Sequence, residues 1–492
     1  MKKIFGKIIL EIIIISSIIL YSHKIILILK GKYMIKLIDR EIELKTLKTE
    51  YDRKGSSFVV IYGRRRIGKT TLINKFCEDK KSIHFLATEE SENENLREFQ
   101  NVVAEELNNN LLKSATVRRW EDIFDVIADA ADEKKKLVVT MDEFQYIGKA
   151  NPAFPSIMMK IWDKSLKDKN IMLIICGSLI NMLTSQVLSY DSPLYGRRTA
   201  QLNMKQIPFS YYKDFVPGLS EDEIIKRYAV TGGVPKYIEI FSDEKDIYKS
   251  IKNNILSKNS FLYAEPEFLL QKEVSEIGSY FSLLKTIAAG NHKLSSIATV
   301  MNVKQTSLSK YLNVLINLDL IERQVPITEE NPEKSKKGLY YIKDNFIKFW
   351  FQFIYANRGL LEAGKEQYVE DKIKKNFIDN HVSFVYEDIC REKTWNLISD
   401  KISFNRVGRW WDKNTEIDIV AYDSNGKDIV FGECKYTDKP KDIDIYYELK
   451  KKCSKVNWHN IDRVEHFVFF SKAGYTNRMQ KLAEEDNNIN LY

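Results

Sequence analysis

The chain has 492 residues, a hydrophobic fraction of 44%, an aromatic fraction of 12% and a formal net charge of +8. This length corresponds to about three domains, and the composition excludes a disordered or fibrous chain. The mild basic excess is compatible with nucleic acid as a partner, but a solvated lysine-rich surface gives the same charge. The five cysteines include no Cys-x-x-Cys pair, which argues against a disulfide framework or a zinc site and favours a reducing cytoplasm.

Residues 1–33 form an apolar N-terminal extension ahead of the first recognisable domain. Its longest uncharged run extends from Ile12 to His23, which is shorter than the roughly 20 apolar residues that a membrane-spanning helix needs. The change of pattern at Met34 favours translation that starts there, and a membrane anchor is the alternative. We therefore expect a cytoplasmic protein, with membrane association only if residues 1–33 are a real anchor.

A phosphate-binding loop is predicted at Gly63–Thr70, between an apolar strand pattern and a helical pattern. Glycines at positions 63 and 68 let the backbone wrap a phosphate chain, because no Cβ stands in the way. The loop N–H groups and the N-terminus of the following helix then face the anion. Lys69 reaches the β- and γ-phosphates of a nucleotide, and the Thr70 hydroxyl can ligate Mg²⁺. The predicted nucleotide-binding residues are Gly63, Arg64, Arg65, Arg66, Ile67, Gly68, Lys69, Thr70 and Thr71.

Two later strand ends carry polar residues suited to the same site. One apolar run ends at Asp142 and Glu143, and an open α/β sheet presents its chemistry at the carboxyl edge of its strands. Asp142 is expected to hold Mg²⁺, and Glu143 to polarise the attacking water as a general base. Ser178 follows the next strand and is a candidate sensor of the γ-phosphate, with an ordinary turn serine as the alternative.

Arg197 and Arg198 follow a glycine just before a fifth strand pattern. A fixed cation stabilises the charge that develops on a transferred phosphoryl group, so this pair predicts an arginine finger. Surface salt bridging explains the pair equally well. If the arginines act on a neighbour's nucleotide, the ATPase domain would assemble into a homo-oligomer.

Five of these segments together resemble the archaeal-type ATPase family, a branch of the AAA+/STAND P-loop ATPases. They are Gly63–Thr70, Asp142-Glu143, Cys-Gly-Ser178, Tyr-Gly-Arg-Arg198 and Gly-Gly-Val-Pro235. The resemblance implies a five-stranded parallel ATPase core over residues 34–204 and a helical lid over residues 205–275. It also implies ATP and Mg²⁺ as cofactors.

Residues 279–343 form a separate predicted unit of three helices and a β-hairpin, which resembles a winged helix-turn-helix. In such a fold the third helix would approach the major groove of DNA, and lysines of the hairpin would contact phosphates. The alternative is a winged helix that serves as an intramolecular interaction module. The polar face of the helix carries Thr306, Ser309, Lys310 and Asn313, and the hairpin lysines are Lys334, Lys336 and Lys337.

The last predicted domain, residues 376–492, carries acidic residues and a lysine on two strands of a hairpin. Asp418 lies on the first strand, and the second strand ends in Glu433-x-Lys435. Because residues i and i+2 of a strand share a face, Glu433 and Lys435 point the same way. Two carboxylates can hold Mg²⁺ near a scissile phosphate while the lysine stabilises charge or positions water.

This hairpin resembles the PD-(D/E)xK nuclease fold, and more closely the nuclease-like domain usually fused behind archaeal-type ATPases. The resemblance implies that Asp418, Glu433 and Lys435 are catalytic and that Asp418 and Glu433 hold the metal. Glu387 is a further acid on a helix. Glu416 ranks lower, because we expect it on the opposite face of its strand.

The sequence thus predicts an α/β protein: a P-loop ATPase with a helical lid, then a winged helix-turn-helix, then a restriction-endonuclease-like domain. The predicted function is binding and hydrolysis of ATP that controls a nuclease-like domain acting on DNA. The alternative is a nucleotide-dependent switch or scaffold with a catalytically silent nuclease fold that only binds DNA or a partner.

Overall fold

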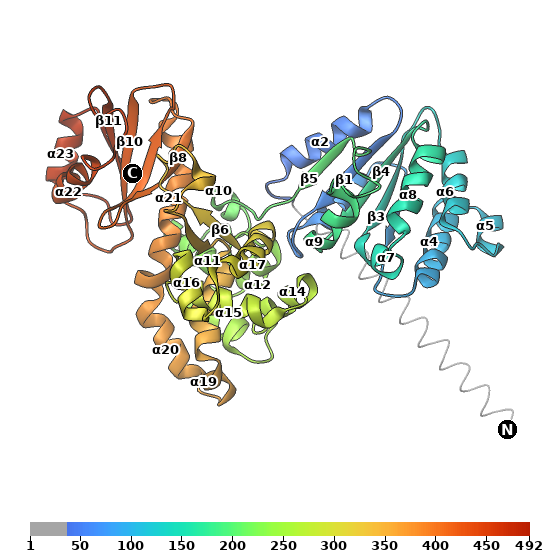
Figure 1. Ribbon diagram of the computed structural model, residues 1–492, viewed down its shortest axis with the longest axis horizontal. Coiled ribbons are helices and arrows are strands. Elements are labelled where there is room, and N and C mark those ends of the chain that lie inside the picture. The colour runs from blue at the N-terminus through green and yellow to red at the C-terminus, as the bar shows by residue number, and fades with distance from the viewer. Residues whose placement is uncertain (1–36) are drawn as a thin grey trace.

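The computed structural model describes residues 37–492, and Figure 1 shows three parts. An α/β domain holds the N-terminal residues, a helical part lies in the middle, and a second α/β domain holds the C-terminus. The predictions for residues 1–33 fall outside the described residues. Within residues 37–492, no helix combines the length and the apolar character needed to cross a membrane.

The N-terminal domain is built on a parallel sheet with the strand order β2-β3-β4-β1-β5. Its central strands are buried almost throughout, as expected for a parallel sheet that is covered on both faces. The predicted parallel-sheet α/β P-loop fold is therefore confirmed. The strands are β1 (Ser57–Tyr62), β2 (Ser82–Leu86), β3 (Leu137–Asp142), β4 (Ile171–Gly177) and β5 (Ala200–Asn203).

Helices cover both faces of this sheet (Figure 1). On one face Leu47 and Leu72 pack on the strands, and on the other face Trp120 and Phe124 belong to a larger aromatic core. The first face is covered by α2 (Glu41–Asp52) and α3 (Lys69–Cys77), and the second by α4 (Glu92–Glu106), α6 (Trp120–Asp129) and α8 (Phe154–Ile161).

The chain then enters the helical part through a tight crossing. Gly233 accepts no side chain, because a Cβ there would lie 1.9 Å from the carbonyl oxygen of Ile207. This glycine lies in the short connection between α11 and α12, which passes directly against the backbone of Ile207. The helices are α10 (Phe209–Tyr212), α11 (Glu221–Thr231), α12 (Pro235–Ser242), α13 (Ile247–Ile251), η3 (Lys252–Leu256) and α14 (Glu265–Glu273).

Three helices and an antiparallel hairpin follow in the order that the sequence indicates. Leu308, Leu312 and Leu315 are buried, so the apolar face predicted for the third helix packs inward. The elements are α15 (Ile277–Ala288), α16 (Leu294–Met301), α17 (Gln305–Asn317), β6 (Ile321–Gln324) and β7 (Leu339–Ile342).

A run of helices leads to the C-terminal mixed sheet, whose order is β12-β11-β10-β9-β8. Strands β8, β9 and β10 pair antiparallel, and β10, β11 and β12 pair parallel. The connecting helices are α18 (Asn345–Phe349), η5 (Trp350–Ile354), α19 (Arg358–Glu362), α20 (Glu366–Phe377), η7 (Ile378–Val382) and α21 (Ser383–Ile398). The domain contains β8 (Arg406–Trp411), β9 (Glu416–Tyr422), β10 (Asp428–Lys435), α22 (Asp444–Cys453), β11 (Val464–Ser471), α23 (Asn477–Glu485) and β12 (Ile489–Leu491).

The hydrophobic cores of the described residues do not coincide with the three parts of the molecule. One continuous core joins the helical part to one face of the C-terminal sheet, where Val430 and Val468 contribute. The ATPase sheet has two cores of its own.

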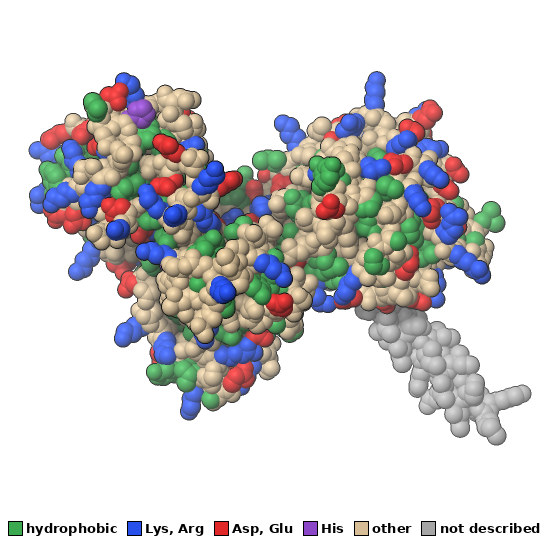
Figure 2. Space-filling view, in the orientation of Figure 1, with side chains coloured by type: hydrophobic (Ala, Val, Ile, Leu, Met, Phe, Trp, Pro, Cys, Tyr) green, Lys and Arg blue, Asp and Glu red, His purple; other side chains and the backbone are tan. Residues whose placement is uncertain are grey.

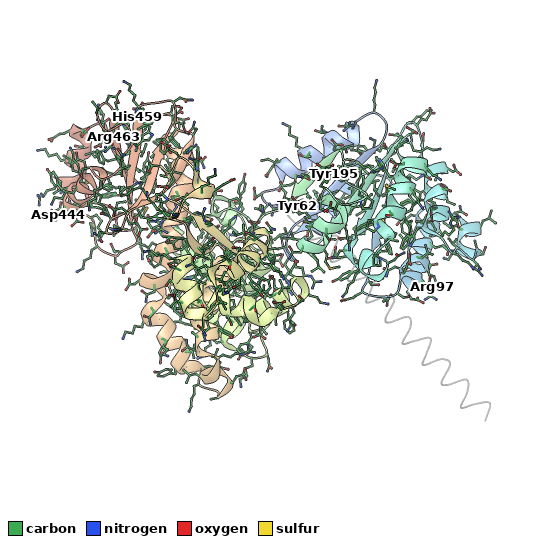
Figure 3. The ribbon with its side chains drawn as sticks, viewed as in Figure 1. Tyr62, Arg97, Tyr195, Asp444, His459 and Arg463 are labelled. Atoms are coloured by element: carbon green, nitrogen blue, oxygen red, sulfur yellow. The ribbon has the colours of Figure 1, made fainter. Side chains whose placement is uncertain are left out.

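Tyr62, at the end of β1, lies on the side of the ATPase domain that faces the helical part (Figure 3). Figure 2 shows basic and acidic side chains interspersed over the visible face of all three parts.

Candidate functional site

The loop Gly63–Thr70 connects β1 to α3 and has the backbone of an anion-binding turn. Gly63 has a φ of 144° and Gly68 a φ of 90°, which glycine adopts without strain. A Cβ on Gly63 would lie 2.4 Å from the carbonyl oxygen of Met204. The loop therefore requires glycine here, and it presents the N-terminus of α3 to an anion.

Lys69 and Thr70 lie where this loop meets the end of β3. Lys69 Nζ donates hydrogen bonds to the carbonyl oxygens of Gly63 and Arg64, both at 2.9 Å. Burial lowers the pKa of Lys69. The Thr70 hydroxyl donates to the buried carboxylate of Asp142 at 2.8 Å. A loop lysine can bind the phosphates of ATP, and a hydroxyl and a carboxylate at the same sheet edge are suitable oxygen ligands for Mg²⁺.

Glu143 and Ser178 meet beside this group. Glu143 Oε2 accepts hydrogen bonds from the Ser178 hydroxyl at 2.7 Å and from its N–H at 3.3 Å, and a further one from Gln145. Glu143 has a φ of 53°, and strained backbone of this kind clusters at functional sites. The structure thus brings Asp142, Glu143 and Ser178 together at the edge that holds the loop.

The three consecutive arginines of the loop contact three different parts of the chain. The buried guanidinium of Arg64 pairs with Asp344, which lies just after β7. The partners of the other two are nearer in sequence. Arg65 Nε donates to the Ser178 hydroxyl at 3.3 Å and its Nη2 to Tyr146, and Arg66 pairs with Glu265 of α14.

The two residues of the candidate arginine finger contact other residues of the ATPase domain. Arg197 donates to Asp163 through Nε (3.1 Å) and Nη2 (2.7 Å), and it also donates to the carbonyl oxygen of Pro193. The hydrogen bonds to Asp163 raise the pKa of Arg197. Arg198 lies 5.5 Å from the centre of the Tyr195 ring. In the described residues neither arginine forms an ion pair or hydrogen bond with the loop.

Helix α14 also contacts the segment that follows Ser178. Glu273 accepts hydrogen bonds from the backbone N–H groups of Ile180 (3.1 Å) and Asn181 (3.5 Å). Burial raises the pKa of Glu273 to about 7, although those hydrogen bonds oppose the change. The helical part therefore touches the ATPase edge through a carboxyl group that titrates near neutrality.

The C-terminal domain contains a cluster of three carboxylates. One oxygen each of Glu387, Glu416 and Asp418 lies within 4.8 Å of the others. Burial, and then the charge of Asp418, raise the pKa of Glu387 to about 7, against the opposing effect of Arg409 and Arg391. Oxygen ligands at this spacing suit a divalent cation such as Mg²⁺.

The expectation that Glu416 lies on the face of its strand opposite to Asp418 is wrong. Side chains two positions apart along a strand point to the same side, and these two carboxylates share the cluster. The pairing of β8 with β9 is also irregular between Gly408 and Trp410, beside these residues. Such irregularities often occur next to active sites, where they redirect a side chain.

Glu433 lies near Asp418 but has different partners. It accepts hydrogen bonds from Lys435 Nζ at 2.7 Å and from Lys452 Nζ at 2.8 Å. Asp418 accepts one from the N–H of Cys434 at 2.9 Å. Burial and then Glu433 raise the pKa of Asp418, while Lys435 and Lys452 lower it. Asp418 therefore lies between two groups. One is formed by the carboxylates of Glu387 and Glu416, and the other is the predicted Glu433-x-Lys435 pair.

Sequence reasoning missed three cations around this cluster. Arg409 pairs with Glu416 and Arg391 with Asp388, and both approach Glu387 at 3.8 and 3.9 Å. Arg391 follows Glu387 by four residues, and this helical spacing could have predicted their contact. The third cation is Lys452, which reaches Glu433 from α22.

Taken together, these features define a P-loop ATPase domain joined to a second α/β domain with a carboxylate and lysine cluster. Comparison with known proteins supports the ATPase assignment of the N-terminal domain. Residues 37–241 match the model of an ATPase domain predominantly from Archaea. Residues 350–454 match a family of archaeal and bacterial proteins of unknown function, and residues 222–351 match a domain of unknown function.

The chain is 37% identical over 435 residues to the uncharacterized protein MJECL04 of Methanocaldococcus jannaschii, over 87% of this chain and 94% of that protein. It therefore belongs to the archaeal-type ATPase family. A shorter relative from the same organism, the uncharacterized ATP-binding protein MJ0423, is 40% identical over 48 residues, which are 10% of this chain and 81% of that protein.

Among solved structures, the fold resembles the Walker-type ATPase Paby2304 of Pyrococcus abyssi. The TM-score is 0.50 at 19% identity, and the match covers 65% of this chain and 97% of that one. At this identity the likeness supports the fold alone, which agrees with an ATP-binding P-loop ATPase.

The burial of Glu273 predicts a contribution to stability that falls as pH rises. Its pKa is raised from 4.5 to about 7, so folding favours the protonated form. The stabilisation is complete below about pH 4.5 and is lost as pH rises through about 7. We expect Glu273→Gln to remove on the order of 1–3 kcal/mol of pH dependence between pH 5 and 8, as measured by urea unfolding. An unchanged pH slope in this variant would contradict the prediction.

Proposed function

We propose that the protein binds ATP with Mg²⁺ at Gly63–Thr70, hydrolyses it with Glu143, and uses nucleotide binding to control a C-terminal nuclease-like domain that acts on DNA. The observation that carries the first part is the convergence of Thr70, Asp142, Glu143 and Ser178 at one sheet edge. The proposed domains are the core at 34–204, the lid at 205–275, the winged helix at 279–343 and the nuclease-like domain at 376–492.

In the proposed ATPase cycle, Lys69 and the loop N–H groups bind the phosphates, and Thr70 and Asp142 would hold Mg²⁺. A metal ion held there would supply the positive charge that balances the charge developing on the phosphates. Glu143 orients and deprotonates the attacking water, and Ser178 holds its carboxylate in place through the 2.7 Å hydrogen bond. Arg197 and Arg198 would contribute to a neighbour's site if the ATPase domains assemble into a homo-oligomer.

The proposal of DNA as partner rests on α17 and the hairpin that follows it. The side chains of Thr306, Ser309, Lys310 and Asn313 are all exposed, as DNA contact by this face requires. Lys334 and Lys336 are exposed as well, whereas Lys337 pairs with Glu329 at 2.6 Å. Two wing lysines and the polar helix face are therefore available to phosphates.

The nuclease proposal rests on Asp418, Glu433 and Lys435, with Glu387 as the helix acid. The carboxylates would hold Mg²⁺, which activates water and stabilises the charge on a scissile phosphate. Lys435 Nζ already lies beside Glu433, and its pKa is raised because Glu433 and Asp418 outweigh the opposing effect of burial. It is therefore protonated at neutral pH and can stabilise an anionic transition state.

A second candidate function is a nuclease fold that binds without cleaving. The observation that favours it is that Glu433 is paired with two lysines, and Glu416 with Arg409. Carboxylates neutralised in this way do not need a metal ion for their stability. In this alternative, nucleotide binding changes the affinity for DNA or a partner, and no strand is cut.

Lys69→Ala should abolish nucleotide binding, because the buried lysine supplies the cation for the β- and γ-phosphates. Isothermal titration calorimetry with ATP and Mg²⁺ measures this directly. Lys75→Ala is the matched control, since Lys75 lies on the same helix in an exposed pair with Glu78 and should leave binding unchanged. Undiminished binding by Lys69→Ala would refute the site.

Glu143→Gln should keep nucleotide binding and slow hydrolysis by about 10²–10⁴-fold, the usual contribution of a general base. Gln retains the acceptor for the Ser178 hydroxyl but cannot take a proton. Phosphate release under single-turnover conditions gives the rate. Hydrolysis at the wild-type rate would exclude Glu143 from this role.

Lys435→Ala should reduce Mn²⁺- or Mg²⁺-dependent DNA cleavage by about 10²-fold or more, because it removes a cation from the reacting phosphate. Lys451→Ala is the control, since Lys451 is exposed on the helix that carries Lys452. Cleavage that persists equally in Lys435→Ala would point to a contaminating nuclease. Binding of DNA without cleavage by the wild type would select the second candidate function.

A further inference from the structure

Asp344 connects the nucleotide loop to the hairpin of the helical part. Its carboxylate is fully buried and accepts from Arg64 of the loop and from Gln206. It also caps α18, since Oδ1 accepts from the N–H of Ile347 at 2.7 Å. Separating one member of a buried ion pair from the other is unfavourable, so Arg64 and Asp344 are expected to move together.

Lys69 holds the backbone of the same arginine. Its Nζ donates to the carbonyl oxygen of Arg64 at 2.9 Å. Lys69 uses two of its three N–H donors on the carbonyl oxygens of Gly63 and Arg64, so a phosphate that attracts the ammonium group competes with these hydrogen bonds. The position of Arg64, and with it that of Asp344, is therefore sensitive to whether Lys69 contacts a nucleotide.

The other end of the same segment contacts the C-terminal domain. Tyr341 of β7, three residues before Asp344, lies with its ring 5.3 Å from the guanidinium of Arg409. The N–H of Ile327 donates to the carbonyl oxygen of Arg409 at 2.9 Å, and Tyr422 donates to the carbonyl oxygen of Ile327 at 3.0 Å. The β6–β7 hairpin is thus fastened to the strand that carries Arg409.

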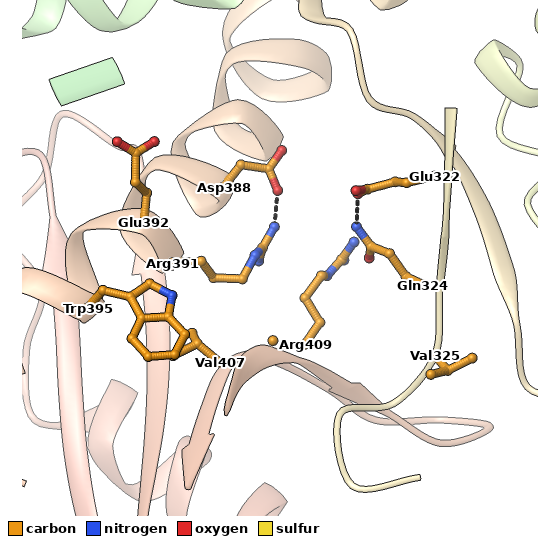
Figure 4. Close-up of a pocket in the computed structure, with 10 residues that line it drawn as sticks. Glu322, Gln324, Val325, Asp388, Arg391, Glu392, Trp395, Val407 and Arg409 are labelled. Atoms are coloured by element: carbon orange, nitrogen blue, oxygen red, sulfur yellow. Dashed lines mark hydrogen bonds and ion pairs between the residues drawn. The ribbon is translucent and has the colours of Figure 1, made fainter. Parts of the chain in front are cut away.

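Arg409 itself lies over the carboxylate cluster. It pairs with Glu416, and its Nη2 is 3.8 Å from Glu387. Figure 4 shows it reaching toward Gln324 of β6, and both side chains line a cavity of about 340 Å³. Arg409 Nε and Gln324 Oε1 are buried without a hydrogen-bond partner among the described residues. A side chain whose polar atoms are not all satisfied can change position at lower cost.

We propose that the side chains of Asp344 and Tyr341, at the two ends of one short segment, transmit nucleotide binding to this cluster, with Arg409 as an inhibitory cation. In the present arrangement the guanidinium of Arg409 competes with any divalent cation for the oxygens of Glu416 and Glu387. When Lys69 and Arg64 shift toward a nucleotide, Asp344 and β7 shift with them, Tyr341 and the hairpin release Arg409, and the carboxylates become free. This inference rests on the proposed function in one respect, that the cluster binds metal.

Hydrogen exchange of the full-length protein tests the transmission without using any activity. We expect saturating ATPγS with Mg²⁺ to speed amide exchange in the segment around Ile327 by about fivefold or more, the lower end of usual coupling between sites. Asp344→Asn keeps the cap on α18 but loses the charge that Arg64 pairs with, so it should bind nucleotide and show no such change. Lys343→Gln is the control, because it removes only the adjacent exposed pair with Asp319 and should respond like the wild type.

Metal binding tests the inhibitory role of Arg409. The occupancy of the cluster is the amount of Mn²⁺ bound per molecule of the wild type minus the amount bound per molecule of the Asp418→Ala variant. ATPγS should raise this occupancy in the wild type and leave it unchanged in Asp344→Asn. Arg409→Gln should bind Mn²⁺ without nucleotide as the wild type does with it. If Asp344→Asn does not fold, Tyr341→Leu breaks the other end of the same connection and should show the same loss of response.

The two proposals fail differently. If the wild type binds ATPγS without faster exchange, or if Asp344→Asn responds like the wild type, the transmission is refuted, whether or not the cluster cleaves DNA. If exchange responds as expected but the cluster binds no Mn²⁺ and cuts nothing, the transmission stands, while the inhibitory role of Arg409 and the nuclease function are refuted.

Discussion

The backbone of the phosphate-binding loop is the constraint on which the rest of the site depends. Three of its residues have positive φ: Gly63, Gly68 and Arg66, the last at 68°. Glycine adopts this conformation freely, but for arginine it costs on the order of 1–2 kcal/mol. Arg66 is held there by the buried carboxylate of Glu265, which also accepts from Tyr237 at 2.7 Å. The loop is thus kept in its anion-binding shape partly by the helical part.

Charge explains why the two parts meet at this loop. Three consecutive arginines repel one another unless each has its own counter-charge or polar partner. Arg64 and Arg66 find carboxylates in the helical part, and the charge of Asp344 outweighs burial enough to leave the pKa of Arg64 raised. The ATPase sheet and the helical part have largely distinct hydrophobic cores, which meet where Ile180 and Tyr62 of the ATPase domain pack against the core of the helical part. Polar contacts therefore carry much of this junction, and junctions of this kind permit relative movement.

Local pattern was enough to predict which polar residues meet at the carboxyl edge of the N-terminal sheet. The loop, Asp142 and Ser178 each follow an apolar strand run, and parallel strands bring their carboxyl ends to one edge. Contacts between distant segments could not be predicted in this way. Arg64 and Asp344 are 280 residues apart, and their pairing depends on how the helices pack. For the same reason the sequence did not show that Asp163 binds Arg197, or that Lys452 reaches Glu433. The prediction for Glu416 was wrong for a simpler reason, because residues two positions apart on a strand, such as Glu416 and Asp418, share a face.

The C-terminal cluster shows how charge balance bears on its chemistry. Glu387, Glu416 and Asp418 lie too close together to be ionised without compensation, and the raised pKa of Glu387 reflects burial and this repulsion. The compensating cations are Arg391, Arg409, Lys435 and Lys452. They favour the ionised carboxylates that a metal needs, yet Arg409 occupies the same oxygens. A metal ion at this cluster would therefore have to compete with these cations. The contacts of Arg409 with Ile327 and Tyr341 make the position of this cation a property of the junction with the helical part.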